Sequence, residues 1–214
     1  MIRLLLPLAL LATQAPTIAL SPAEGAKSVH TTELKITLPA FDITINSTGT
    51  STFSKVTDAG FEVEEVISDV KVVAGGQELS PAVNPVKVTM GKDGTIKSMA
   101  GGVEGANQAL TYILFRFVPT PAETGKTTTV ELKGNGSDIP DQKVESTYIG
   151  PKKVDAGEGF EFKQKTTANE LVVDTDYVVK ADGTILEATT KFTGLPVPAA
   201  GGSADGTGTM KLKP

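Results

Sequence analysis

The chain has 214 residues, contains neither cysteine nor tryptophan, and carries a formal net charge of −5. The lack of cysteine excludes a disulfide framework and a thiolate metal site, and the acidic balance argues against binding to nucleic acid or to an anionic lipid surface. A chain of this length can bury one sizeable core, in a single domain or in two fused half-domains.

The N-terminus has the layout of a secretory signal peptide. Arg3 precedes a short apolar run, and the small residues at 17–19 offer a cleavage site, whereas residues 13–15 offer a poorer one because Pro16 would follow the cut. The run is interrupted well before the roughly 20 apolar residues that a spanning helix needs. We therefore expect a signal peptide over residues 1–19 and no transmembrane anchor after its cleavage. An exported chain without cysteine favours a secreted or periplasmic protein of a bacterium.

Alternating apolar and polar residues predict strands through the first half of the chain. The alternation runs over residues 33–38 and 41–46, and a period of two is typical of antiparallel strands with one solvated face. Further runs at residues 50–56 and 61–73 lead to an Asp-Gly pair at residues 93–94. Such a pair between apolar runs indicates a hairpin, because glycine supplies the positive φ of the turn. The first half is therefore predicted to be a β meander.

One amphipathic helix is predicted over about residues 103–118, at the join between the halves. Apolar residues recur there at i, i+3, i+4 and i+7, and Pro119 closes the segment, although a strand over residues 113–118 would also fit. Against the concave face of a curved sheet, this stripe would either fill the core or line an apolar pocket, so it is the candidate ligand-binding surface. The stripe comprises Leu110, Ile113, Leu114 and Phe117.

The second half returns to strand patterns separated by turns rich in glycine, proline and aspartate. A second Asp-Gly pair stands at residues 182–183, and the stretch at 146–157 is similar to that at 51–61. The two repeats have different spacings, so a duplication would require small insertions. We expect a mainly β protein, formed by one or more curved antiparallel sheets or half-barrels, with one amphipathic helix between its two halves. Its two halves, residues 20–118 and 119–214, are either related to each other or parts of one continuous domain.

No set of residues in the chain forms a known catalytic or cofactor-binding motif. His30 is the single histidine, so the chain cannot form a histidine-rich metal site. We expect His30 to be a surface residue. Residues 124–127 are similar to the end of a phosphate-binding loop, but the first glycine of that motif is missing and a strand pattern follows instead of a helix. We therefore predict no catalytic residue, no metal and no cofactor.

Carboxylates gather in two places in the second half. Paired carboxylates can hydrolyse glycosides or bind calcium, but we favour a solvated strand face and a turn, because neither cluster has the spacing of a known calcium loop. A carboxylate-dependent hydrolase, with roles for Glu158 and Asp176, stays as an alternative. The clusters are Asp155, Glu158 and Glu161, and Asp174 with Asp176.

Several turn motifs carry a resemblance to uncharacterised exported bacterial β-rich proteins. They are the Pro-Thr-Pro at 119–121 with Gly125, the Lys-Val-Asp-Ala-Gly at 153–157, and the Asp-Gly pair at 182–183. The resemblance implies no particular activity. The predicted architecture also resembles periplasmic lipoprotein carriers, in which an incomplete β-barrel holds acyl chains under helices.

The leading hypothesis is a non-enzymatic, exported envelope protein that acts as a binding or structural module. Its partner would be another envelope protein or an apolar ligand, and nucleic acid is not expected. The first alternative is a carrier of an apolar ligand or lipid, which would use the concavity of the sheet.

Overall fold

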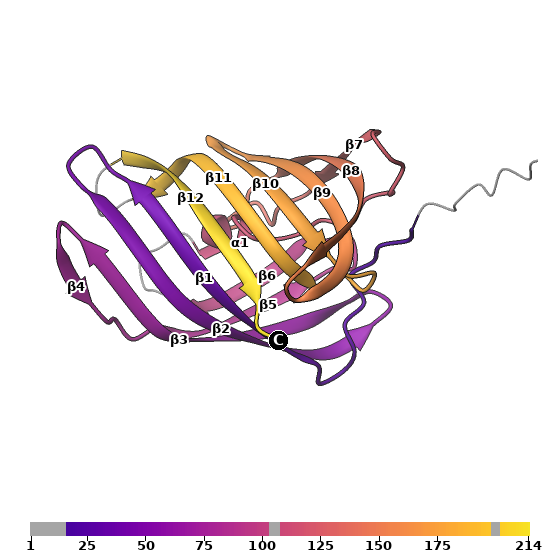
Figure 1. Ribbon diagram of the computed structural model, residues 1–214, viewed down its shortest axis with the longest axis horizontal. Helices are drawn as coiled ribbons and strands as arrows, with labels where there is room; N and C mark the ends of the chain where they lie inside the picture. The colour runs from indigo at the N-terminus through magenta and orange to yellow at the C-terminus, as the bar shows by residue number, and fades with distance from the viewer. Residues whose placement is uncertain (1–15, 103–107, 198–201) are drawn as a thin grey trace, which may run out of the picture.

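The computed structural model describes residues 16–102, 108–197 and 202–214, and within these ranges the chain forms one antiparallel sheet of 12 strands and one short helix (Figure 1). The sheet curls into a half-barrel-like shell but does not close. This confirms the predicted mainly β class with a curved antiparallel sheet. No helix in the described ranges is long and apolar enough to cross a membrane.

The strands follow one another along the chain with the helix in the middle. The first half contributes β1 (Lys27–Thr37), β2 (Asp42–Thr57), β3 (Gly60–Ala74), β4 (Gln77–Leu79), β5 (Asn84–Met90) and β6 (Ile96–Gly102), followed by α1 (Gln108–Ile113). The second half contributes β7 (Thr127–Leu132), β8 (Gln142–Val154), β9 (Gly157–Ala168), β10 (Leu171–Val179), β11 (Ile185–Val197) and β12 (Gly202–Leu212).

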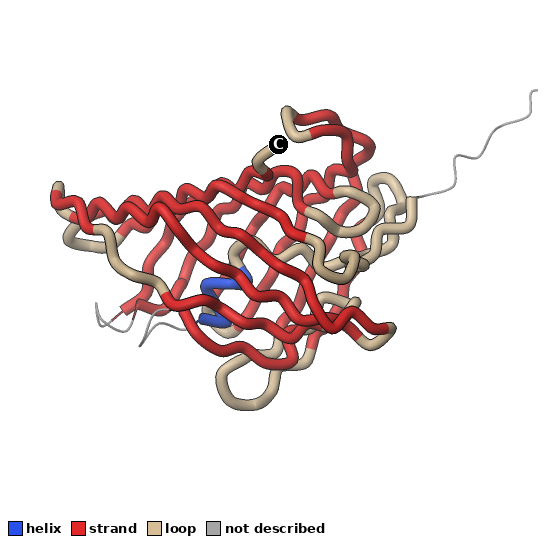
Figure 2. The backbone as a smooth tube through the Cα atoms, turned by 90° about the horizontal axis from the view of Figure 1, so that it is seen from below, coloured by secondary structure: helices blue, strands red, loops and turns tan. Residues whose placement is uncertain are grey.

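Each half is an antiparallel meander, and the two meanders join along β1 and β12. The strand order is β6-β5-β3-β2-β1-β12-β11-β10-β9-β8-β7, with the short β4 paired to β3. Strands β1 and β12 pair over eight positions, from His30 opposite Leu212 to Thr37 opposite Asp205. The two ends of this strand order are therefore β6 and β7, and helix α1 lies inside the curve of the sheet (Figure 2).

The two Asp-Gly hairpins have the same local structure. Asp93 Oδ1 accepts a hydrogen bond from the Thr95 amide over 2.9 Å, and Asp182 Oδ1 accepts one from the Thr184 amide over 2.9 Å. The glycines that follow have φ angles of 86° and 84°, which a residue with a Cβ rarely adopts. The hairpins join β5 to β6 and β10 to β11. A duplication of the two halves stays a prediction.

Helix α1 is shorter than the helix predicted from the apolar stripe. Residues 103–107 of that prediction lie outside the described residues, and residues 114–118 form a turn and an irregular segment instead of helix. The carbonyl of Arg116 accepts a hydrogen bond from the Tyr177 hydroxyl, and Val118 is bonded to a side chain of β9. These contacts replace helical ones, and Pro119 disfavours a helical conformation of the residue before it.

The concave face of the second half is filled by the chain itself. Phe162, Tyr177 and Phe192 are almost fully buried, and the Phe117 ring packs edge-on against two of them. The ring centroids lie 5.2 Å apart for Phe117 and Phe162, and 5.5 Å apart for Phe117 and Tyr177. Such edge-to-face pairs are favourable beyond the apolar area that they bury. The segment after α1 thus forms the core of the second half.

The described part of the N-terminus packs against the second Asp-Gly hairpin. Ile18 and Leu20 are buried, and the Ala19 amide donates to the Ala181 carbonyl over 3.1 Å. The predicted cleavage position after Ala19 therefore falls inside a packed segment. Residues 1–15 lie outside the described residues, and the signal peptide stays a prediction.

Candidate functional site

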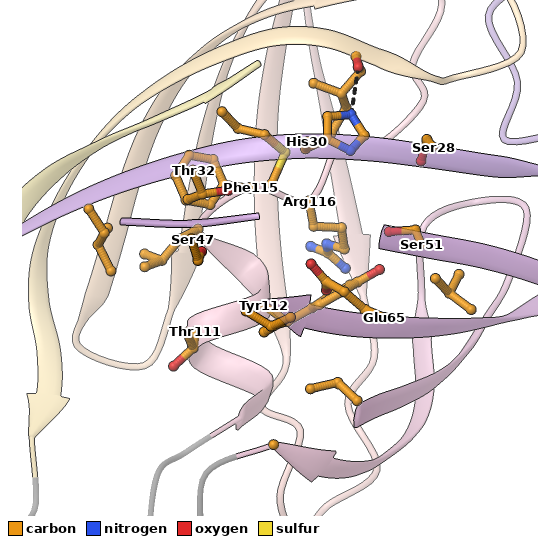
Figure 3. Close-up of a pocket in the computed structure, with 18 of the residues that line it drawn as sticks. Ser28, His30, Thr32, Ser47, Ser51, Glu65, Thr111, Tyr112, Phe115 and Arg116 are labelled. Atoms are coloured by element: carbon orange, nitrogen blue, oxygen red, sulfur yellow. Dashed lines mark hydrogen bonds between the residues drawn. The ribbon is translucent and has the colours of Figure 1, made fainter. Parts of the chain in front are cut away.

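A pocket of about 380 Å³ lies under the first half of the sheet, between β1, β2 and β3 on one side and the helix with its following turn on the other (Figure 3). Its walls are mostly apolar. This volume falls in the range of small-molecule binding sites, which are concave, mostly apolar and carry a few placed polar groups. Among the apolar residues of the wall are Leu34, Ile45, Phe53, Val63, Ile67 and Phe115.

A band of polar residues crosses the apolar wall on three neighbouring strands. On β1 and β2, Thr32 stands opposite Ser47. Four positions further along each strand, Ser28 stands opposite Ser51, which stands opposite Glu65 of β3. Because alternate residues of a strand face the same side, these side chains share the concave face. We call this set the polar band; it comprises Ser28, His30, Thr32, Ser47, Ser51 and Glu65 (Figure 3).

Apolar residues flank the polar band at both ends. Leu34 pairs with Ile45 on one side of it, and Phe53 pairs with Val63 on the other. A ligand lying across the strands would therefore meet apolar wall, then polar groups, then apolar wall again. This order suits a molecule that has a polar group attached to apolar parts.

Glu65 is the acidic side chain of the polar band, and its carboxyl group lies over Gly49 of the neighbouring strand. A Cβ atom at position 49 would come within 2.6 Å of Glu65 Oε1, so the glycine makes room for the carboxyl group. Burial raises the pKa of Glu65. Within the described ranges no hydrogen bond or ion pair involves this carboxyl group. Glu65 is therefore an unpaired acid that lines the pocket.

His30 lies on the concave face, and the prediction that it is a surface residue is wrong. Its strand position, opposite Gly49, turns the imidazole inward, where it is half-buried and lines the pocket. Nε2 lies 2.9 Å from the Ile185 carbonyl oxygen. A carbonyl only accepts, so Nε2 carries the proton and Nδ1 is left as an acceptor. Burial lowers the pKa of His30, which keeps the ring neutral at pH 7.

Arg116 is a buried cation at the inner wall of the pocket, and both of its terminal nitrogens donate to other groups of the protein. One terminal nitrogen donates to the Gly94 carbonyl over 2.6 Å, and the other donates to Gln142 Oε1. Its Nε is buried with no hydrogen-bond partner in the described ranges. Burial lowers the pKa of Arg116 to about 10, so the group stays charged at pH 7.

Tyr112 connects the two charged residues of the pocket electrostatically. Burial raises the pKa of its hydroxyl, the negative charge of Glu65 raises it further, and the positive charge of Arg116 lowers it. The hydroxyl is therefore protonated at pH 7 and lies within the influence of both charges. Figure 3 shows Tyr112 beside Glu65 on the side of the pocket that α1 forms.

The structure divides the predicted apolar stripe between core and pocket. Leu114 and Phe117 line the pocket, whereas Leu110 and Ile113 are buried elsewhere in the core. A ligand contact by any of the four stays a prediction. The sequence reasoning missed the polar band, although one signal was present: Glu65 stands in phase with the apolar, inward-facing Val63 and Ile67 of β3.

The carboxylate clusters of the second half lie on the solvated surface. Asp174 and Glu158 are exposed, Asp176 lies 3.5 Å from the Lys163 ammonium, and Glu161 lies 2.7 Å from that of Lys152. No group of three or more histidine, aspartate or glutamate residues in the described part of the chain could hold a metal ion. These positions lend no support to a carboxylate-dependent hydrolase.

Comparisons bear on neither the fold family nor the function. The resemblances to exported bacterial β-rich proteins and to lipoprotein carriers stay predictions, because they depend on turn motifs and on architecture. No protein-family model, curated protein or solved structure matches this chain.

Proposed function

We propose that this chain is an exported, non-enzymatic binding protein that holds a small apolar molecule in the pocket of its first half. The observation that carries the proposal is the contrast between the two halves. The concave face of the second half is filled by Phe117, Phe162 and Tyr177, whereas that of the first half leaves about 380 Å³ between apolar walls. A ligand that covers the apolar surface of a cavity removes that surface from water, and this burial favours binding and stabilises the folded protein.

Export to the periplasm or the cell exterior is part of the proposal. It depends on the signal-like N-terminus with Arg3 and the apolar run behind it. A protein that holds an apolar molecule outside the cytoplasm would shield that molecule from water in the cell envelope. This function needs no catalytic group and no cofactor.

The dependence of affinity on ligand length tests the proposal. Methyl octanoate, methyl decanoate and methyl dodecanoate would compete with the dye Nile red for the protein. Each methylene that enters the pocket contributes about 0.8 kcal/mol, so each should tighten the dissociation constant about fourfold until the pocket is full. An affinity that does not change with chain length would contradict the proposal.

A pair of variants connects this binding to the pocket. Ser47→Phe places an aromatic ring in the pocket from β2, because Ser47 lies in its wall. Asn46→Phe adds the same ring at the neighbouring exposed position, which faces away from the pocket. We expect Ser47→Phe to abolish competition by the esters and Asn46→Phe to leave it unchanged. Equal binding by the two variants would place the ligand elsewhere.

A further inference from the structure

The two halves of the sheet carry similar inward-facing pairs on corresponding strands, a serine opposite a glutamate in one half and a serine opposite a glutamine in the other. In the first half, Ser51 of β2 stands opposite Glu65 of β3. In the second half, Ser146 of β8 stands opposite Gln164 of β9. Each pair belongs to the strand pairing that follows the first hairpin of its meander. The second half therefore shows what such a pair does when its concave face is occupied.

In the second half, this pair lies against an irregular segment of main chain, and Gln164 forms hydrogen bonds with Val118 of that segment. Gln164 Oε1 accepts the Val118 amide over 3.1 Å, and its Nε2 donates to the Val118 carbonyl over 2.6 Å. The same Nε2 lies 3.1 Å from Ser146 Oγ, which also accepts from the Thr120 hydroxyl over 2.8 Å. The side-chain amide of Gln164 thus accepts a hydrogen bond from the Val118 N–H group, which lies on the concave side of the sheet.

In the first half, the corresponding pair faces the pocket without an occupant from the described chain. Glu65 has no hydrogen-bond or ion-pair partner there, and Gly49 leaves space for its carboxyl group. A carboxylate only accepts hydrogen bonds, so the missing partner is a donor. Half-buried and unpaired, the ionised form of this group is costly, and a donor or a cation would stabilise it.

The other titratable groups of the pocket do not supply that partner. The terminal nitrogens of Arg116 donate to Gly94 and Gln142, which lie on the hairpin after β5 and on β8. His30 is neutral at pH 7, with Nε2 directed to Ile185, and the Nδ1 atom only accepts. The Tyr112 hydroxyl is protonated and feels the charge of Glu65, but no hydrogen bond joins the two groups within the described ranges. Glu65 thus faces no cation that is free to pair with it among the described residues.

We propose, building on the function proposed above, that the ligand is an amphiphile whose N–H head group donates to Glu65 beside Ser51, while its alkyl chain lies along the apolar wall. An ammonium group suits Glu65 best, because it donates and also supplies the missing positive charge. Hydrogen bonds between ionised partners are stronger than neutral ones. An amide N–H would bind in the way that the Val118 amide binds to Gln164.

Three ligands of equal chain length separate the head groups. Dodecylammonium, dodecanamide and methyl dodecanoate would compete with Nile red for the full-length protein at pH 7.5. We expect dodecylammonium to bind at least about tenfold more tightly than the ester, since a charge-assisted hydrogen bond contributes about 1.5–3 kcal/mol. The amide should fall between them.

Two substitutions assign the preference to Glu65. Glu65→Gln introduces the residue of the second half, so it should keep the binding of dodecanamide and lose the advantage of dodecylammonium. Glu64→Gln is the matched control, because Glu64 is the exposed neighbour that faces away from the pocket, near Lys87. This control should keep the wild-type order of the three ligands.

The outcomes distinguish this inference from the proposed function. If the ester binds as tightly as the ammonium, or if Glu65→Gln keeps the preference for the ammonium, the inference is overturned while apolar binding stands. If none of the three ligands displaces the dye, the proposed function itself fails.

Discussion

The guanidinium of Arg116 donates a hydrogen bond to the main-chain carbonyl of Gly94 over 2.6 Å, and this contact ties the segment after α1 to the hairpin between β5 and β6. The other terminal nitrogen reaches Gln142 at the start of β8. One side chain therefore links the two halves of the shell close to their free edges. Because Arg116 also lines the pocket, this link holds the inner wall of the site in place.

Replacing Arg116 by methionine should destabilise the protein. The substitution leaves two buried acceptors without donors at about 1–3 kcal/mol each, partly offset by removal of a buried charge, so we expect a net loss of about 2 kcal/mol. Arg116→Lys should also be less stable, because one ammonium group cannot donate to the Gly94 carbonyl and to Gln142 with the geometry of the planar guanidinium. Urea unfolding measures both changes. Wild-type stability of Arg116→Met would show that the link contributes nothing.

Gly49→Ala should change ligand preference more than stability. The added methyl group would meet the flexible end of Glu65, 2.6 Å from Oε1, and the carboxyl group can swing away. We expect the free energy of unfolding to change by less than about 1 kcal/mol, because alanine also restricts the unfolded chain. Displacement of the carboxyl group should weaken dodecylammonium and spare methyl dodecanoate. An equal loss for both ligands would point to a general distortion of the pocket instead.

Acidification should weaken the fold through His30. Its pKa lies below the ordinary value of 6.5 because of burial, so between these two values the unfolded chain binds more protons than the folded one. The free energy of unfolding therefore falls as the pH drops through this window. Glu65 acts in the opposite direction, since its pKa is raised above 4.5, while Arg116 stays charged and Tyr112 stays protonated.

The contribution of His30 is isolated by comparing the wild type with His30→Gln at pH 7.5 and pH 5.0. Glutamine keeps an N–H group for the Ile185 carbonyl but does not titrate. The wild type should lose stability relative to the variant at the lower pH. A stability difference that stays constant between the two pH values would contradict a neutral, buried imidazole.

A chain that begins at Leu20 should be less stable than one that begins at Pro16. The shorter chain loses the buried side chain of Ile18, 7% exposed, and the hydrogen bond from the Ala19 amide to Ala181. Burying an isoleucine side chain contributes about 1.5–3 kcal/mol, so we expect a difference near the middle of that range. Thermal or urea unfolding of the two chains measures it. Equal stability would show that this segment does not support the fold.

The strands and hairpins could be predicted from the sequence because their signals are local. Alternation over residues 33–46 and the Asp-Gly pairs depend only on neighbouring residues, and the structure has strands and turns there. The end of the helix could not be predicted in this way. It depends on Tyr177 and Gln164, which lie far along the chain and bind the main chain of residues 116–118.

The pocket could be predicted only in part. Leu114 and Phe117 belong to the apolar stripe, but the polar band is assembled by the register of three strands, which no single segment reveals. The signal that the sequence reasoning missed is Glu65, a charged residue in phase with the inward-facing Val63 and Ile67 of β3. The space beside Gln164 is filled by the main chain at Val118, whereas the space beside Glu65 is left open. This difference depends on the path of the rest of the chain, which the local sequence does not reveal.

The most direct test of ligand binding in the first half is native mass spectrometry of the protein isolated from the organism that makes it. The protein should carry an additional mass of a small molecule, and lipid extraction should recover that molecule. The Ser47→Phe variant, expressed and isolated in the same way, should be free of it while remaining folded. A wild-type protein that shows only the mass of its own chain, or a variant that retains the bound molecule, would contradict the account.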